Sequence, residues 1–374
     1  MTLYISGADQ ISPAWLTEVL RQSGALQQGE VEAVEYQKTD AFNSDTFHLV
    51  LRYSGEVSPA PPTQLILKRN TSESWSREAG AEEVKFYMLV ASLPDPPSAI
   101  IPCYAAAYDE ASGNSYVLLL DLSATHRSPV TRDQQVSIEE GMPTVKDIEA
   151  VVDAMARLHA YWWEHSWLHT GTFPVGYWSR NADRFEQYLR RRTTAWRSLI
   201  ADESEWFPDD LHDLYERLFA RLPAYWEQHL APRFRALKNL TLIHGDAYFA
   251  NFLCPKDSVT GTTYWMDWQS PTLDLSSYDL VNLCATFWTS EQRHEGQREE
   301  KILRQYHAVL QVNGVSNYTW DDLLMDYRYG LIFWLSMPVQ DRYGGSRKEY
   351  WWPKMQCLLA AFREWKCEEL LDIR

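Results

Sequence analysis

The chain has little that would tie it to an oxidising compartment or to a membrane. Its N-terminal residues lack a basic stretch followed by an apolar core, and no apolar run is long enough to cross a bilayer. We therefore expect no signal peptide, no membrane partner and a cytoplasmic location. The five cysteines are odd in number, scattered and without a C-x-x-C pair, which argues against a disulfide framework or a zinc site. They are Cys103, Cys254, Cys284, Cys357 and Cys367.

Basic charge is also scarce. The 374 residues include 35 Lys and Arg against 51 Asp and Glu, which gives a formal net charge of −16. A chain this acidic is a poor match for the phosphate backbone of a nucleic acid, so we expect no nucleic-acid partner. The length is sufficient for two domains or lobes with a sizeable core. Nothing in the composition indicates an oligomeric state.

One stretch of closely spaced polar residues stands out between two apolar runs. Residues 244–251 read HGDAYFAN, so Asp246 is followed by Asn251 at the spacing of a kinase catalytic loop. In that loop the Asp accepts the proton of the substrate hydroxyl and the Asn holds magnesium. A second apolar run, residues 262–266, ends in Asp267. The turn-rich segment before it predicts a hairpin that brings Asn251 and Asp267 together as oxygen ligands of a metal ion.

The HGD-x4-N motif and the strand ending in Asp-Trp-Gln resemble the aminoglycoside phosphotransferase and choline kinase-like superfamily. Within it the sequence is most similar to the ecdysteroid kinase-like small-molecule kinases. The resemblance implies an α+β, two-lobed protein-kinase-like fold, with a small antiparallel β-sheet lobe carrying one main helix and a larger, mainly helical lobe. It also implies transfer of the γ-phosphate of ATP or GTP to a small-molecule hydroxyl. Asp246 would be the base, Asn251 and Asp267 would hold Mg²⁺, and His244 would brace the loop.

A predicted hairpin near the N-terminus stands where kinases place the loop over the nucleotide phosphates. Its strands are residues 31–38 and 46–53, and its tip contains no glycine, which departs from the protein-kinase pattern. The superfamily often has a small polar residue there, and Ser44 with its neighbours could present backbone N–H groups to phosphate. An ordinary hairpin turn explains the same residues equally well.

Lys68 ends a predicted strand over residues 64–68, like the strand lysine of kinases. The helix predicted over residues 76–92 offers three carboxylates, and periodicity selects Glu83. It shares a face with apolar residues, whereas Glu82 lies on the polar side. A carboxylate on an apolar face needs a partner, and Lys68 is the natural one. The kinase resemblance implies the same ion pair, because residues 83–87 resemble an E-x-x-F-Y segment of the ecdysteroid kinase-like group.

Residues 116–120 form an apolar strand that leads into Asp121 and Leu122. This junction resembles the hinge of the group, whose backbone would hydrogen-bond adenine. We place the boundary between the lobes here. The nucleotide-binding lobe is then residues 1–121, and residues 122–374 form the catalytic and acceptor-binding lobe.

In the second lobe an apolar stripe predicts a helix up to Trp162, with His159 as a core histidine rather than a catalytic one. The aromatic-rich region after it varies within the superfamily and helps form the acceptor pocket. Its aromatic and acidic side chains favour a neutral or cationic acceptor, namely an amino alcohol, an aminosugar or an apolar polycyclic alcohol. Packing in the core and solvation at the surface explain these residues at least as well. The run from Arg190 to Arg192 reads as a solvated helix face.

Two other functions fit parts of the pattern. A pseudokinase would keep the fold and bind nucleotide without catalysis, but the chain retains Lys68, Asp246, Asn251 and Asp267 together. A metal-dependent hydrolase could use His244, Asp246 and Asp267 as ligands. That site would need more histidine and a further ligand, which the neighbouring sequence does not supply.

Overall fold

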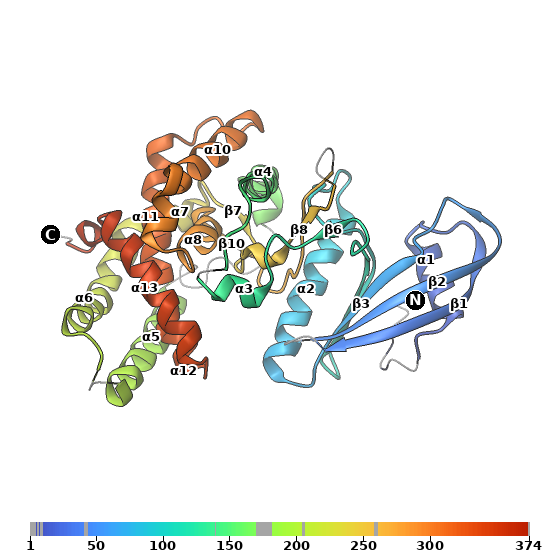
Figure 1. The fold of residues 1–374 in the computed structure, drawn as a ribbon, viewed down its shortest axis with the longest axis horizontal. Helices are drawn as coiled ribbons and strands as arrows, with labels where there is room; N and C mark the ends of the chain where they lie inside the picture. The colour runs from blue at the N-terminus through green and yellow to red at the C-terminus, as the bar shows by residue number, and fades with distance from the viewer. Residues whose placement is uncertain are drawn as a thin grey trace. The chain divides into compact units, whose positions relative to one another are not determined.

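The computed structural model describes residues 5, 7, 10–40, 44–138, 140–169, 182–203, 206–257 and 261–372. The chain forms two compact units (Figure 1). The first contains Met1–Arg127 and Leu253–Pro271, and the second contains Ser128–Phe252 and Thr272–Arg374. The first unit thus ends beyond the boundary placed at residue 121. It also takes in a later segment that the sequence assigned to the second lobe, because Cys254 of that segment pairs with Arg127 of the first unit.

The first unit is built on a five-stranded antiparallel sheet with the strand order β1-β2-β3-β5-β4. A small second sheet has the order β6-β8-β9. The strands and helices predicted for this lobe all form, and strands β1 and β2 are longer than their apolar patterns indicated. The elements are α1 (Pro13–Gln22), β1 (Gln28–Asp40), β2 (Ser44–Ser58), β3 (Gln64–Asn70), α2 (Ser74–Ser92), β4 (Cys103–Asp109), β5 (Asn114–Leu120), β6 (His126–Arg127), β8 (Phe252–Pro255) and β9 (Tyr264–Trp265).

The two helices of this unit pack against opposite faces of the sheet. Leu65 and Leu67 of β3 are fully buried in the core that the sheet shares with α1. Side chains alternate between the faces of a strand, so Lys68 points to the other face, where α2 packs against β3, β4 and β5. A Cβ atom at Gly80 would collide with Ser115 of β5, so the glycine lets α2 approach the sheet closely. This close packing determines where the α2 carboxylates lie.

The second unit is mainly helical, and its helix α8 is buried along its whole length. Helix α4 packs on α10, and α8 packs on α11. The elements are α3 (Arg132–Val136), α4 (Val145–Trp162), η2 (Ser166–His169), α5 (Ala182–Glu203), α6 (Asp209–Tyr225), η3 (Trp226–Leu230), α7 (Ala231–Ala236), β7 (Thr241–Ile243), η4 (Phe249–Asn251), β10 (Thr272–Asp274), α8 (Ser277–Ala285), α9 (Ser290–His294), η5 (Glu295–Gln297), α10 (Arg298–Val312), α11 (Trp320–Leu335), α12 (Met337–Tyr343), α13 (Lys348–Glu364) and η6 (Cys367–Leu370).

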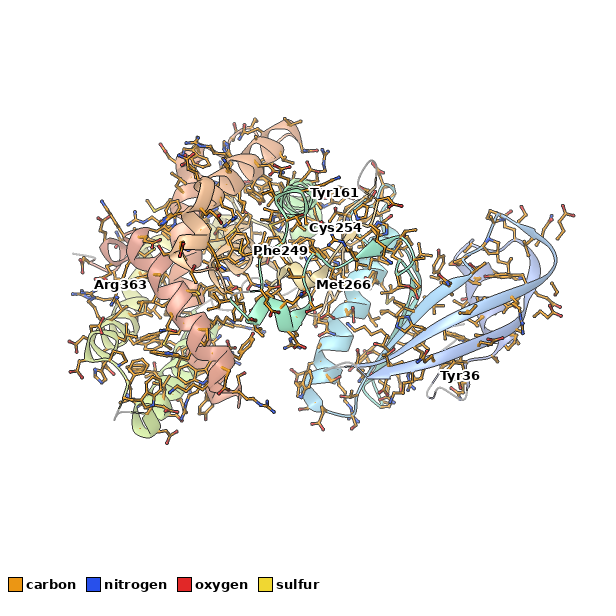
Figure 2. All side chains as sticks on the ribbon, viewed as in Figure 1. Tyr36, Tyr161, Phe249, Cys254, Met266 and Arg363 are labelled. Carbon is orange, nitrogen blue, oxygen red and sulfur yellow. The ribbon has the colours of Figure 1, made fainter. Side chains whose placement is uncertain are left out.

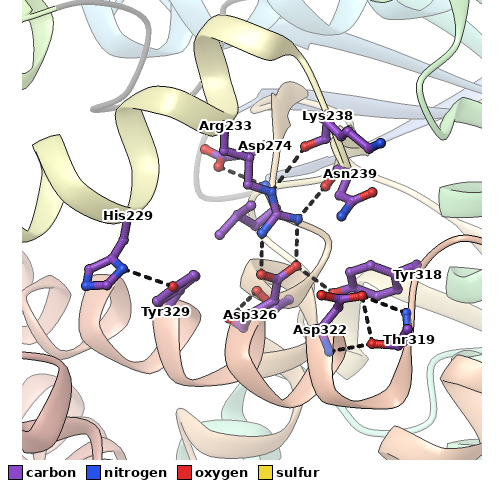
Figure 3. Close-up of polar contacts among 12 residues, drawn as sticks. His229, Arg233, Lys238, Asn239, Asp274, Tyr318, Thr319, Asp322, Asp326 and Tyr329 are labelled. Atoms are coloured by element: carbon purple, nitrogen blue, oxygen red, sulfur yellow. Dashed lines mark hydrogen bonds and ion pairs between the residues drawn. The ribbon is translucent and has the colours of Figure 1, made fainter.

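Strand β7, which leads into the HGDAYFAN stretch, is held at its start by a buried ion pair (Figure 3). The guanidinium of Arg233 pairs with the carboxylate of Asp326 on α11 and also donates to the carbonyl of Asn239 at 2.7 Å. Tyr318 donates its hydroxyl to the same carboxylate at 2.6 Å. Arg233 therefore ties the turn before β7 to α11. This ion pair could not be predicted from local sequence, since Arg233 and Asp326 are far apart in the chain.

The structure confirms the predicted fold class, a mixed α+β chain with an antiparallel sheet lobe and a larger helical lobe. All five cysteines are free thiols. Across the described ranges, no helix has the length and apolar character that a membrane crossing requires.

Candidate functional site

The first unit brings three of the predicted site residues together. The Nζ atom of Lys68 lies 2.9 Å from Oε2 and 3.1 Å from Oε1 of Glu83, and it also contacts Oδ1 of Asp267. Glu83 is 3% exposed, whereas Glu82 pairs with Lys85 at the surface. The helix periodicity therefore selected the correct glutamate, and the predicted Lys68–Glu83 pair is present. Its role towards a nucleotide stays a prediction.

Asp267 is held by its neighbours in the chain. The indole of Trp268 is fully buried and stacks on Phe86 of α2, with ring centroids 4.0 Å apart. The side chain of Gln269 hydrogen-bonds Glu83. Asp267 itself has a φ of 68°, a left-handed conformation that non-glycine residues adopt at a cost. The packing of Trp268 and Gln269 on α2 maintains this conformation and directs the carboxylate of Asp267 towards Lys68.

The charges in this cluster are unequal in number, with two carboxylates around one ammonium. Burial opposes the charge on Lys68, but Asp267 and then Glu83 raise its pKa above the ordinary lysine value, so the ammonium persists at neutral pH. Burial raises the pKa of Glu83, with Lys68 acting in the opposite direction and Asp267 adding to the rise. Asp267, the more exposed of the two carboxylates, could serve as an oxygen ligand of a divalent cation.

Ser44 lies beside this cluster, at the end of the connection between β1 and β2, whose last paired residues are Asp40 and Asp45. It opens β2, pairs with Asn70 of β3 and is 3% exposed. Its hydroxyl has no hydrogen-bond partner among the described residues, and it lines a small cavity together with Lys68 and Glu83. The neighbours at the tip, residues 41–43, lie outside the described residues. The phosphate-binding role of this segment therefore stays a prediction.

The predicted hinge follows β5 directly. The backbone N–H of Asp121 donates to Gln64 at 3.2 Å, and the Leu122 carbonyl accepts from the two N–H groups of Thr125 and His126. Among the described residues, the Asp121 carbonyl and the Leu122 N–H have no such partner. These two groups belong to one trans peptide and point in opposite directions, so they cannot both meet one adenine edge. The hinge role of Asp121 and Leu122 stays a prediction. The Asp121 carboxylate is occupied by Ser123 and His48.

The second unit holds Asp246 and Asn251 in one short loop. The side-chain N–H₂ of Asn251 donates to the Asp246 carbonyl at 2.8 Å and to the Asp246 carboxylate at 3.3 Å. These bonds fix which end of the amide is the oxygen, and that oxygen has no partner among the described residues. Asn251 thus anchors the carboxylate of Asp246 and leaves a hard oxygen available as a ligand.

Asp279 of α8 braces the start of this loop. Its fully buried carboxylate accepts from the backbone N–H groups of His244 at 2.8 Å and Gly245 at 3.0 Å. It also accepts from Nε2 of His159 at 3.2 Å, while Nδ1 of His159 faces the Tyr306 hydroxyl at 2.7 Å. His159 is thus the hydrogen-bonded core histidine that the sequence predicted, and Asp279 braces the loop through its backbone. His244 accepts from the Asp246 N–H at 3.2 Å and helps to brace the loop.

Between the base and the metal ligand, the loop is anchored by aromatic rings. Phe249 lies in the second unit (Figure 2), where its side chain is fully buried. Its ring stacks on that of Trp288, with centroids 5.5 Å apart. The hydroxyl of Tyr248 accepts a hydrogen bond from the buried Lys354 of α13 at 3.1 Å. Sequence analysis missed Lys354, although Trp351 and Leu358 place it on an apolar helix face, the same signal that identified Glu83.

The two predicted metal ligands belong to different units, Asn251 to the second and Asp267 to the first. Strands β8 and β9 are hydrogen-bonded neighbours, as the predicted hairpin requires. The joint role of Asn251 and Asp267 in holding a metal stays a prediction. Within the part of the chain that the structure describes, no group of three or more His, Cys, Asp or Glu side chains is arranged to hold a metal ion.

Comparison with known proteins gives a consistent result for the fold. The choline kinase of Cryptosporidium parvum Iowa II has a similar structure, with a TM-score of 0.54, 12% identity and coverage of 91% of this chain and 90% of that one. The ethanolamine kinase of Plasmodium vivax has a TM-score of 0.50 and 9% identity, and the match covers 89% of this chain and 85% of that one. The GDP complex of aminoglycoside 2'-phosphotransferase-IIIa has a TM-score of 0.49 and 14% identity, and the match covers 96% of this chain and 100% of that one. At these identities the likeness concerns the fold.

The family comparison reaches further than the fold. None of the curated proteins compared with the chain matches it. The phosphotransferase enzyme family matches residues 45–315, which is well over half of the sequence. This span runs from β2 of the sheet lobe through the HGDAYFAN loop and Asp267 to the end of α10. The chain therefore belongs to the phosphotransferase enzyme family.

Proposed function

We propose that the protein is a small-molecule kinase that transfers the γ-phosphoryl group of ATP or GTP to the hydroxyl of a small neutral or cationic alcohol. Asp246 is the base that orients the acceptor hydroxyl and takes its proton. Asn251 and Asp267 are the metal ligands, and Lys68, fixed by Glu83, contacts the phosphates. Positioning and charge stabilisation supply the catalysis, so no covalent enzyme intermediate is required.

The observation that carries this proposal is the bonding of the Asn251 amide to Asp246. Both N–H bonds of the amide go to Asp246. They hold the carboxylate in place and direct the amide oxygen elsewhere. Asp279 meanwhile fixes the loop through two backbone N–H groups. A loop that only connected two strands would not need a buried carboxylate and an oriented amide at this spacing.

The residues present fit a hard divalent cation such as Mg²⁺. Asn251 offers a carbonyl oxygen without a partner among the described residues, and Asp267 adds a carboxylate beside a charge-unbalanced cluster. Both are oxygen ligands of the kind that Mg²⁺ prefers, with the nucleotide phosphates completing its coordination. When bound, the ion would neutralise charge that develops on the transferred phosphoryl group.

The nucleotide would engage three features of the first unit. The ammonium of Lys68 is charged and close to Asp267, so it can offset the negative charge of a phosphate group. The backbone at the predicted hinge, Asp121 and Leu122, would contact the base through either the Asp121 carbonyl or the Leu122 N–H. Ser44 lines the cavity next to Lys68 with an unpaired hydroxyl. These contacts do not discriminate ATP from GTP.

The acceptor class rests on the second unit. The acidic residues expected to favour a cation are partly engaged, since Glu203 lies 3.6 Å from Arg342 and Asp210 lies 2.6 Å from Arg363. This pairing weakens the case for a cationic acceptor relative to a neutral one. An anionic acceptor is not favoured either. Arg190 is exposed and Arg192 donates to Gln340 at 2.5 Å, so the arginine run does not form a single anion-binding group.

The experiment that tests the proposal is a phosphorylation screen. Purified protein is incubated with MgATP or MgGTP and a mixed library of neutral, cationic and anionic alcohols, and products are identified by mass. A phosphorylated alcohol that needs both protein and Mg²⁺ supports the proposal. Nucleotide binding without any phosphorylated product across the library would instead indicate a pseudokinase.

A further inference from the structure

Tyr248 occupies the middle of the proposed catalytic loop and links its two functional residues. Its backbone N–H donates to the Asp246 carbonyl at 2.9 Å, and its own carbonyl accepts from the Asn251 N–H at 2.9 Å. The base and the metal ligand are thus both bonded to the Tyr248 backbone. A change in the position of Tyr248 would therefore move Asp246 and Asn251 together.

The Tyr248 side chain is in turn held by a buried cation. Lys354 of α13 is 2% exposed, and its Nζ atom donates to the Tyr248 hydroxyl at 3.1 Å and to Oδ2 of Asp341 at 2.9 Å. The rings of Trp334 and Tyr350 lie 5.2 and 5.4 Å from the same atom. A carboxylate and aromatic faces are the partners that stabilise a desolvated ammonium.

The charge on this lysine persists in its buried position. Burial opposes it, but Asp341 and then Tyr248 raise the pKa of Lys354 well above the ordinary lysine value. Burial also raises the pKa of Tyr248, so the phenol stays neutral and accepts from the ammonium. A methionine would fill the same space, whereas only the ammonium supplies the hydrogen bond that fixes the phenol.

We propose that Lys354 is a positioning residue for phosphoryl transfer. Its ammonium, held by Asp341 among the rings of Trp334 and Tyr350, fixes the Tyr248 hydroxyl and thereby sets the positions of Asp246 and Asn251. The inference rests on the proposed function, since it assigns a role towards Asp246 as the base. The interaction is built entirely within the second unit, from α11, α12, α13 and the loop.

A double-mutant cycle tests the coupling. Lys354→Met keeps the side-chain volume and removes the charge, and Tyr248→Phe removes only the hydroxyl. Each should lower kcat about tenfold or more, because small misplacements of reacting groups cost rate steeply. The KM for the nucleotide should change little. The double variant should lose no more than either single variant, since both remove one interaction. Lys348→Met on the same helix, an exposed cation over Trp206, is the matched control and should keep the wild-type rate.

Rescue with a small amine separates a positioning role from simple packing. Lys354→Ala leaves space for propylammonium. Added propylammonium should raise the melting temperature of this variant up to a saturating concentration and restore part of its kcat. Propan-1-ol, of similar size and neutral, should do neither. Rescue by propanol equal to that by propylammonium would overturn the proposal.

Two further kinetic outcomes would also overturn it. One is a wild-type kcat in Tyr248→Phe. This variant keeps the packing of the ring, so it remains informative even if the Lys354 variants fold poorly. The other is additive losses in the double variant. A wild-type protein with no phosphoryl transfer would refute the proposed function. An active wild type with an unaffected Lys354→Met would refute only the role of Lys354.

Discussion

The Nζ atom of Lys68 lies 2.9 Å from the buried carboxylate of Glu83, while the neighbouring Glu82 pairs with Lys85 at the surface. Two adjacent glutamates of one helix thus have opposite environments. Glu83 shares its ammonium partner with Asp267, so its charge belongs to the candidate site. Glu82 takes part in an ordinary i,i+3 helix pair, worth about 0.2–0.5 kcal/mol.

This difference predicts unequal effects of the same substitution. Glu83→Gln should lower kcat/KM for the nucleotide, because Lys68 then has only Asp267 to fix it. Glu82→Gln should leave the kinetics near the wild-type values. The measurement is the kcat/KM of both variants in steady-state kinetics with MgATP as the varied substrate. Equal effects from the two substitutions would contradict the assignment of Glu83.

Lys68→Met tests the same pair from the other side. It leaves Glu83 buried without its cation, which typically costs about 3–5 kcal/mol. We expect a fall in the free energy of unfolding of that order, measured by denaturant titration, together with a sharp loss of activity. A Lys68→Met variant with wild-type stability would show that burial of the Glu83 carboxylate does not require the Lys68 ammonium.

The brace beneath the catalytic loop makes a prediction about stability. Asp279→Ala should leave the N–H groups of His244 and Gly245 without their acceptor, at about 1–3 kcal/mol for each unsatisfied donor. Activity should fall as well, because the loop loses its anchor. Asp153→Ala, which breaks the exposed pair with Arg157, is the control and should cost about 0.3–0.5 kcal/mol. Similar melting temperatures for the two variants would refute the bracing role.

The metal assignment predicts a dependence on divalent cations that runs through Asp267. Asn tolerates the left-handed φ of this position, so Asp267→Asn removes the charge with little backbone cost. Turnover should fall about 10²-fold or more, and the concentration of Mg²⁺ needed for half-maximal rate should rise. Asp267→Ala should abolish activity and weaken the binding of Mg-nucleotide. Full wild-type turnover in excess EDTA would show that the site works without a metal.

The acceptor preference can be measured once a substrate is known. Neutral alcohols, and cationic ones to a lesser degree, should be phosphorylated faster than anionic ones of similar size at both low and high salt. Replacing the exposed Arg190 and Arg191 by alanine should not alter that order. A preference for anionic alcohols that disappears in the double alanine variant would reassign the arginine run to the acceptor pocket.

Much of this arrangement follows from local sequence. Helix periodicity separates Glu83 from Glu82, strand alternation directs Lys68 to the α2 face, and the spacing in HGDAYFAN places Asn251 beside Asp246. Each of these relationships is fixed by the geometry of one element or one short loop. The apolar stripe of α4 likewise identifies His159 as a core residue before its partners are known.

The remaining features depend on contacts between residues distant in sequence. Arg233 and Asp326 meet only because the fold brings α7 and α11 together, and Lys354 reaches Tyr248 only through the packing of α13. The assignment of residues 253–271 to the first unit depends on the pairing of β8 with β6. The apolar neighbours of Lys354 at helical spacing did mark it as buried, whereas its partner could not be read from them.

The most direct test of the account compares the wild type with Asp246→Asn. The substitution is nearly isosteric and keeps an oxygen that can accept from Asn251, so the melting temperature should stay close to the wild-type value. Both proteins are incubated with MgATP and an alcohol that the wild type phosphorylates, and the phosphorylated product is quantified by mass spectrometry. The account predicts a fall in turnover of about 10²-fold or more, the scale of a positioned general base. Near-normal turnover in a folded Asp246→Asn protein would contradict it.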